Sequence, residues 1–257
     1  MLPTRTRRSA LLVAAALLLA ACGRAGTGGS PAAAPDQLTV FAAASLTGAF
    51  TELGRRYTAA QGTRVRFNFA GSQALATQLR QGTPADVFAS ADLANMAKVR
   101  DLVGTPRSFA SNLLQIVVEK GNPRHVTGLK DLADPGLKVV LAAPDVPAGR
   151  YAAQALAKAE VAARPVSQED NVKAVVAKVA LGEADAGIVY VTDVAAGGDK
   201  VQGVDIPRDQ NVTATYPIAT VTAGGNRDKA QAFVDLVLSG QGRQVLRRYG
   251  FRPPPTT

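Results

Sequence analysis

The sequence predicts an α/β fold of two lobes, with mostly parallel sheets joined by hinge crossovers. Two observations support this prediction. Apolar, β-branched runs alternate along the chain with stretches of helical periodicity, which is typical of parallel strands covered by helices. The alternation restarts near Lys138, and there are enough strands for two sheets. We expect the chain to cross between the lobes around residues 113–118 and to return around residues 216–222.

The first series of elements precedes the predicted crossing. Residues 47–60 show helical periodicity, with Ala49, Phe50, Leu53 and Tyr57 on one face. We expect strands at residues 38–42, 65–69 and 113–118, a short strand within residues 85–92, and helices at residues 47–60 and 72–81.

The second series follows the crossing and ends in a helical region, residues 227–249, interrupted at Ser239 and Gly240. We expect strands at residues 138–142, 186–191 and 213–222, and helices at residues 148–158 and 171–181. These elements place residues 37–115 and 219–257 in lobe 1 and residues 116–218 in lobe 2.

The first residues of the chain read as an export signal. Three arginines precede an uncharged apolar run over residues 10–21, which is too short to span a bilayer as a helix. The sequence Leu-Ala-Ala-Cys that ends at Cys22 is similar to a bacterial lipobox. We therefore expect a lipoprotein signal peptide over residues 1–21, a lipid on Cys22 and a flexible tether over residues 22–36. The alternative is an ordinary signal peptide that leaves Cys22, the single cysteine, as a free thiol.

The composition argues against several functions. The formal charge is +9, and it falls to +6 without the three arginines of the signal. Basic residues are scattered and no aromatic residues interleave with them, so nucleic-acid binding is not expected. The chain contains no tryptophan and a single histidine, His125, in a turn rich in glycine, proline and basic residues. This composition argues against metal sites, cofactors and histidine-based catalysis.

Two strand ends carry the most informative pattern. The stretches "TVFAAASLTGAF" (39–50) and "RFNFAGSQALATQL" (66–79) each end a strand in small residues and place a serine where a helix begins. Ligands bind beyond the carboxyl ends of strands in open α/β sheets, and helix N-termini attract anions. Ser45 and Ser72 are therefore candidate donors to an anion. The alternative is that each serine is an N-cap that only stabilises its helix.

The charge pattern around the two serines narrows the ligand. No lysine or arginine lies in either serine turn, so the site is expected to use neutral donors. Such a site suits a compact, fully ionised anion, since each hydrogen bond to a charged group contributes about 1.5–3 kcal/mol. We expect Asp86 and Asp92 to cap turns, because a carboxylate repels a dianion. Arg150 is expected to face solvent or an acidic neighbour.

Six motifs in order resemble the molybdate-binding proteins of bacterial ABC transporters. They cover nearly all of residues 38–251: "VFAAASLTGAF", "FAGSQALATQL", "GTPADVFASAD", "VPAGRYA", "EADAGIVY" and "RRYGF". The resemblance implies a type II periplasmic-binding-protein-like fold that holds a tetrahedral oxyanion between its lobes. The ligand contacts it implies are the hydroxyls of Ser45, Ser72 and Tyr190 and the backbone N–H groups of Ala148 and Val172.

Three points of the resemblance stay open. The second serine turn is often serine-rich in the family, whereas Gly71 and Gln73 flank Ser72 here. Asn171 is a rival to Val172 as the backbone donor. Tyr190 ends an apolar strand and could instead only pack at a lobe edge.

These observations predict a lipid-anchored, extracytoplasmic solute-binding protein. It is expected to act as a monomer that captures molybdate, and also tungstate, and to deliver it to a membrane-embedded ABC permease. One alternative is the same fold binding another ligand, such as sulfate, thiosulfate or a metal ion. A serine hydrolase is the less favoured alternative, because neither serine lies in a G-x-S-x-G motif and the only histidine is distant in sequence.

Overall fold

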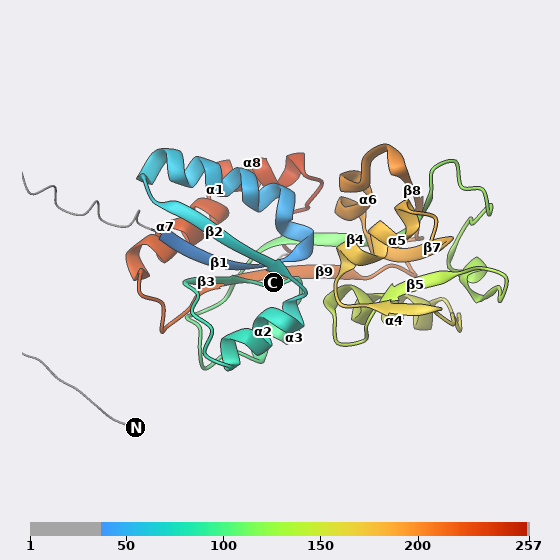
Figure 1. Cartoon of the computed structure of the whole chain (residues 1–257), viewed down its shortest axis with the longest axis horizontal. Coiled ribbons are helices and arrows are strands. Elements are labelled where there is room, and N and C mark those ends of the chain that lie inside the picture. Colours follow the sequence, from blue (N-terminus) through green and yellow to red (C-terminus); the bar gives the residue numbers. More distant parts are fainter. Residues whose placement is uncertain (1–36, 256–257) are drawn as a thin grey trace, which may run out of the picture. The chain divides into compact units, whose positions relative to one another are not determined.

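The computed structural model describes residues 37–255, which lie within one compact unit, Pro35–Thr257 (Figure 1). The predicted signal peptide, Cys22 and the tether over residues 22–36 lie outside the described residues. Within residues 37–255, no helix is both long and apolar enough to cross a membrane.

The described strands form a sheet in the order β2-β1-β3-β9-β4-β7-β5-β6, with β8 paired to β4. Their bounds are β1 Gln37–Ala43, β2 Arg64–Ala70, β3 Val87–Ala89, β4 Arg107–Glu119, β5 Val139–Ala142, β6 Ser167–Glu169, β7 Ala186–Tyr190, β8 Val201–Asp205 and β9 Thr213–Thr220. Parallel pairing joins β1 to β2 and β3, and β5 to β6 and β7, whereas β4, β8 and β9 pair antiparallel.

Helices cover these strands. Their bounds are α1 Thr47–Gln61, α2 Ser72–Arg80, α3 Leu93–Ala97, α4 Pro147–Lys158, α5 Val172–Ala180, α6 Val191–Gly197, α7 Arg227–Leu238 and α8 Gly240–Arg248. The short 3₁₀ helices are η1 Ala44–Leu46, η2 Leu129–Ala133 and η3 Gly198–Lys200. The predicted interruption of the last helical region is confirmed at Ser239, whose hydroxyl accepts a hydrogen bond from Gly242 N–H and so caps α8.

Two long strands connect two lobes. β4 pairs with β9 up to Leu113 and with β7 and β8 from Leu114 or Gln115 onward. Figure 1 shows β4 and β9 running from the group of β1–β3, α1–α3, α7 and α8 to the group of β5–β8 and α4–α6. We call these groups lobe 1 and lobe 2. The predicted two-lobed α/β fold class is confirmed, and the residue limits predicted for each lobe stay a prediction.

The core of lobe 1 fixes the start of α1. The predicted apolar face is buried: Phe50 and Leu53 are fully inaccessible to solvent, and Tyr57 nearly so. The Phe50 ring meets that of Phe233 of α7 edge to face, with centroids 6.0 Å apart. Burial of each such side chain contributes about 1.5–3 kcal/mol. This packing holds α1, and the η1 turn before it, at the carboxyl end of β1.

Candidate oxyanion-binding site

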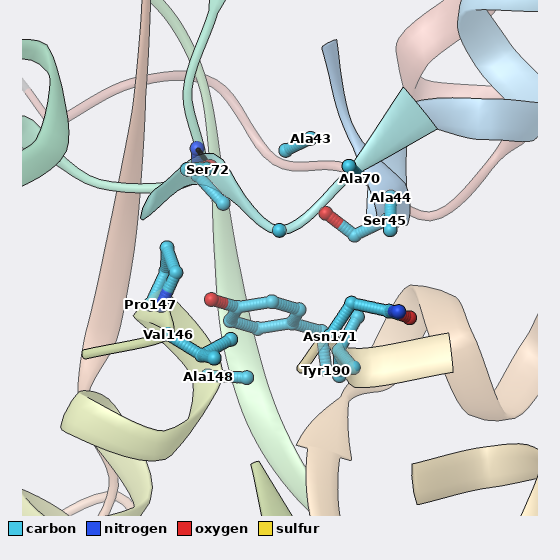
Figure 2. Close-up of a pocket in the computed structure, with 13 residues that line it drawn as sticks. Ala43, Ala44, Ser45, Ala70, Ser72, Val146, Pro147, Ala148, Asn171 and Tyr190 are labelled. Atoms are coloured by element: carbon cyan, nitrogen blue, oxygen red, sulfur yellow. Dashed lines mark hydrogen bonds between the residues drawn. The ribbon is translucent and has the colours of Figure 1, made fainter. Parts of the chain in front are cut away.

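A small cavity lies where the two lobes meet. The cavity volume is about 10 Å³, far below the usual range for organic ligands. All five residues predicted to contact the ligand line it: Ser45, Ser72, Ala148, Val172 and Tyr190. The other lining residues are Ala43, Ala44, Ala70, Gly71, Ala91, Val146, Pro147 and Asn171. The small side chains let backbone from both lobes come close to the same point (Figure 2).

Ser45 lies inside the η1 turn and does not cap a helix. The N-cap of η1 is Ala43, that of α1 is Leu46, and neither helix has a side-chain cap hydrogen bond. The Ser45 hydroxyl instead lies 3.1 Å from the hydroxyl of Tyr216 on β9. Because Ser45 already has helical backbone, its side chain does not reach the N–H groups that a cap would satisfy.

Ser72 has a different partner. It is the first residue of α2, after Gly71 as N-cap, and no side-chain cap bond is present. Its oxygen accepts a hydrogen bond from Ala91 N–H at 3.0 Å. An N–H group only donates, so the Ser72 proton remains available to a ligand. The interpretation of both serines as N-caps is therefore wrong.

Lobe 2 contributes helix N-termini. The backbone ladder of α4 begins with Arg150 N–H donating to Val146 O, so the N–H of Ala148 precedes it. In α5, the Asn171 side chain caps Ala174 N–H at 3.1 Å, which leaves Val172 as the first helical N–H. Asn171 and Val172 both line the cavity, and the choice of Val172 as donor stays a prediction.

Tyr190 ends β7 and points its hydroxyl into the space between the Ser72 turn and Pro147 (Figure 2). The side chain is 1% exposed, and its hydroxyl has no hydrogen-bond partner among the described residues. Burial raises the pKa of Tyr190 well above its ordinary value, so the hydroxyl keeps its proton. A buried hydroxyl without a partner costs about 1–3 kcal/mol, which a ligand could recover.

The charged residues considered in the sequence, Asp86, Asp92 and Arg150, are engaged away from the cavity. Among the described residues that line it, none is charged. Asp86 accepts from Thr39 N–H at 2.7 Å, and Asp92 caps α3 through Asn95 N–H at 2.9 Å. Arg150 forms an ion pair with Asp92 at 2.8 Å, which confirms the expected acidic neighbour. That pair joins α4 of lobe 2 to the start of α3 in lobe 1.

The structure offers no histidine and no metal-ligating cluster at the cavity among the described residues. His125 is exposed in a turn with φ 53°. Among the described residues, no group of three or more histidine, cysteine, aspartate or glutamate side chains could hold a metal ion. The cavity therefore combines hydroxyls with the positive ends of α2, α4 and α5, an arrangement that suits an anion without a countercharge.

Two lobes that close over a small cavity of uncharged donors define a solute-binding protein. The chain matches the family of bacterial extracellular solute-binding proteins over residues 38–252 and belongs to that family. It is 43% identical to the molybdate-binding protein ModA of Mycobacterium tuberculosis, over 96% of each chain. The resemblance predicted from the motifs is thereby confirmed.

Solved structures agree. The substrate-binding domain of a putative molybdenum ABC transporter from Clostridium difficile is 27% identical, with a TM-score of 0.63 over 85% of this chain and 99% of that one. The sulfate-binding protein SubI of Mycobacterium tuberculosis has a TM-score of 0.76 at 21% identity, over 85% of this chain and 87% of that one. The second likeness shows the fold alone.

Sequence reasoning missed the residues behind the lining. Tyr216 and Ala91 hold the two serines, yet they lie 171 and 19 residues away from them in the sequence. Tyr216 lies in an ordinary apolar strand without a motif. The only available sequence signal was a tyrosine, with its polar hydroxyl, inside an apolar strand.

Proposed function

We propose that this protein captures molybdate between its lobes and holds it with uncharged donors. The donors are the hydroxyls of Ser45, Ser72 and Tyr190 and the backbone N–H groups of Ala148 and Val172. The observation that carries the proposal is the Tyr190 hydroxyl, which is buried, protonated and without a partner among the described residues, and which points into the space between the Ser72 turn and Pro147.

The chemistry of the lining supports an oxyanion without a proton. Every lining hydroxyl or helix-terminal N–H is a donor, and none of the described lining residues is acidic. Molybdate is fully ionised at neutral pH and offers only acceptors. The 43% identical relative is itself named for molybdate.

Tungstate has nearly the same size and charge as molybdate, so the same donors are expected to bind it. Sulfate or thiosulfate is the second candidate, because each is an oxyanion with the same charge that the same donors could contact. Sulfate has shorter bonds, so its oxygens would leave some of these donors at poor distance. Molybdate is therefore the better match.

The proposal extends to transport. The protein delivers its ligand to a membrane-embedded ABC permease, acts as a monomer outside the cytoplasm, and is held at the membrane by a lipid on Cys22. Replacing Cys22 by alanine is expected to release the protein from the membrane fraction and to leave molybdate binding unchanged. Retention of the variant in that fraction would contradict the anchor.

Tyr190→Phe tests the proposal through two effects of opposite sign. Removal of a buried hydroxyl without a partner is expected to raise the melting temperature of the ligand-free protein. Molybdate affinity in isothermal titration is expected to fall by about 1.5–3 kcal/mol, one hydrogen bond to a charged group. Absence of molybdate binding by the parent, or unchanged affinity in the variant, would contradict it.

A further inference from the structure

Two pairs of polar side chains, Ser45–Tyr216 and Asn112–Thr192, involve the strands that pass between the lobes. The Tyr216 hydroxyl is 3.1 Å from Ser45 Oγ, and Tyr216 is fully buried. Asn112, 1% exposed, donates through Nδ2 to Thr192 Oγ1 at 2.8 Å. Asn112 and Tyr216 belong to β4 and β9, the strands that pass between the lobes, and Thr192 belongs to α6 of lobe 2. The Tyr216–Ser45 contact therefore links the crossing strand β9 to one wall of the cavity.

Hydrogen-bond partners determine the orientation of the Asn112 amide and of the Tyr216 hydroxyl proton. Leu113 N–H donates to Asn112 Oδ1 at 3.0 Å, so this atom is the amide oxygen and the other atom is the nitrogen. One Nδ2 hydrogen serves Thr192. The Tyr216 hydroxyl is buried, its proton needs an acceptor, and Ser45 Oγ is the partner within hydrogen-bond distance, so we orient the Tyr216 proton toward Ser45 Oγ.

The state of Tyr216 agrees with this direction. Burial raises its pKa far above the ordinary value for tyrosine, so the hydroxyl is protonated at neutral pH. Ser45 Oγ accepts that proton, and the serine proton is then directed away from Tyr216. Ser45 also lines the cavity, so this proton can reach a ligand there.

We propose that Tyr216 is a positioning residue. Its hydroxyl fixes the Ser45 hydroxyl as a donor toward the ligand and so favours oxyanions that carry no proton. This inference rests on the proposed function. The Ser72 hydroxyl is also left to donate toward the ligand, because its oxygen accepts from Ala91 N–H. This donor is a backbone group, so no side-chain substitution removes it.

A purely structural role for Tyr216 is the competing explanation. Its ring packs edge to face against Phe109, Tyr190 and Phe251, at centroid distances of 6.2, 5.9 and 5.4 Å. Tyr216→Phe keeps these ring contacts and removes only the hydroxyl. Tyr57→Phe is the matched control, since that buried hydroxyl donates to Lys229 O at 2.9 Å, between α1 and α7.

The test is a double-mutant cycle of Tyr216→Phe and Ser45→Ala, with molybdate affinity measured by isothermal titration. In the parent background, Tyr216→Phe is expected to weaken molybdate about tenfold, from misalignment of one hydrogen bond to a charged ligand. In the Ser45→Ala background, it is expected to change affinity less than about twofold, because the tyrosine acts through the serine. Tyr57→Phe is expected to leave affinity unchanged.

Selectivity gives a second readout. At mildly acidic pH phosphate carries protons, and a Ser45 hydroxyl freed by Tyr216→Phe can turn to accept one. The affinity ratio of molybdate to phosphate is expected to narrow in this variant and to stay unchanged in Tyr57→Phe. Additive effects in the cycle, or an unchanged ratio, would overturn the inference. A parent that binds no molybdate would instead overturn the proposed function and this inference with it.

Discussion

The two walls of the cavity use different chemistry for the same purpose. Lobe 1 presents serine hydroxyls, each held from behind by a partner from another strand or loop: Tyr216 for Ser45 and Ala91 N–H for Ser72. Lobe 2 presents the starts of α4 and α5 together with one tyrosine hydroxyl. Side-chain substitutions can therefore remove the donors of the first wall. Most donors of the second wall are backbone N–H groups, whose positions depend on where two helices begin. Closure of the lobes is expected to bring both walls onto one ligand.

The largest effect is expected where the walls meet. An added Cβ at Gly71 would overlap Asp170 O of lobe 2 and the side chain of Gln73. Gln73 already bonds to that same carbonyl at 2.8 Å. Gly71→Ala should therefore hinder closure and weaken molybdate on the order of 100-fold, because two or three hydrogen bonds to the ligand would no longer form with good geometry.

Titration and small-angle scattering measure this effect together. The parent is expected to contract when molybdate is added, and Gly71→Ala to contract less. Gly128→Ala, at a position with open space around it, is the control. Parent-like affinity in Gly71→Ala would show that the lobes do not need to approach this closely.

Removal of the lobe 1 hydroxyls should have the next largest effect. Ser45→Ala and Ser72→Ala are each expected to weaken molybdate by about 1.5–3 kcal/mol in isothermal titration. Each also leaves a buried partner unsatisfied, so some stability of the ligand-free protein is lost as well. Thr47→Val is the control, because its hydroxyl bonds to Ala44 O in the same turn. A Thr47→Val loss equal to that of the serines would mean that turn stability alone controls binding.

A smaller effect is expected from the ion pair between the lobes. Arg150 and Asp92 are 2.8 Å apart, with 28% and 3% of their side chains exposed. Arg150→Met leaves a buried carboxylate uncompensated near the anion, which should weaken molybdate severalfold. Adding Asp92→Asn should recover most of the loss. Arg80→Met, which breaks an exposed pair within lobe 1, should change nothing. Failure of Asp92→Asn to recover affinity would exclude charge as the cause.

The smallest effect on affinity is expected from Asp193, whose substitution acts on the stability of lobe 2. Burial raises the pKa of Asp193 from 3.8 to about 7. The folded state therefore holds this proton more tightly, and stability from protonated Asp193 is lost as pH rises from about 4 to about 7. Asp193→Asn should remove this loss, which is on the order of a few kcal/mol.

Thermal melts of the parent and of Asp193→Asn between pH 4 and 8 measure the difference. The gain in stability of the variant should grow with pH up to about 7 and then stay constant. Asp209→Asn, at an exposed position, is the control. Parallel curves for the parent and Asp193→Asn would show that Asp193 does not titrate in this range.

Local sequence patterns predicted the strands and helices that border the site. The small residues after β1 and β2, the Ser72 start of α2 and the Pro147 start of α4 are sequence-local signals, and the structure has these elements within one or two residues of the predicted limits. β4 was predicted to begin at Leu113 but begins at Arg107, because its first half is polar and shows no clear alternation. α6 was missed because it follows β7 without a turn signal.

The roles of the serines could not be read from local sequence. A serine at a helix start resembles an N-cap, and only the folded chain shows that Tyr216 and Ala91 engage these hydroxyls. The Arg150–Asp92 pair was equally inaccessible, since its members lie 58 residues apart on different lobes. Pairing across a sheet or between lobes depends on topology, whereas composition and periodicity report only on neighbours.

The central claim is that uncharged donors from both lobes hold a fully ionised tetrahedral anion. Competition titration tests this claim most directly. The parent protein is saturated with molybdate and challenged with tungstate, sulfate and phosphate at neutral pH. Tungstate should compete about equally, and sulfate on the order of a thousandfold more weakly, since two or three donors lose good geometry. Phosphate should not compete detectably, because its proton would face another donor. Sulfate competing as well as molybdate, or measurable displacement by phosphate, would contradict the account.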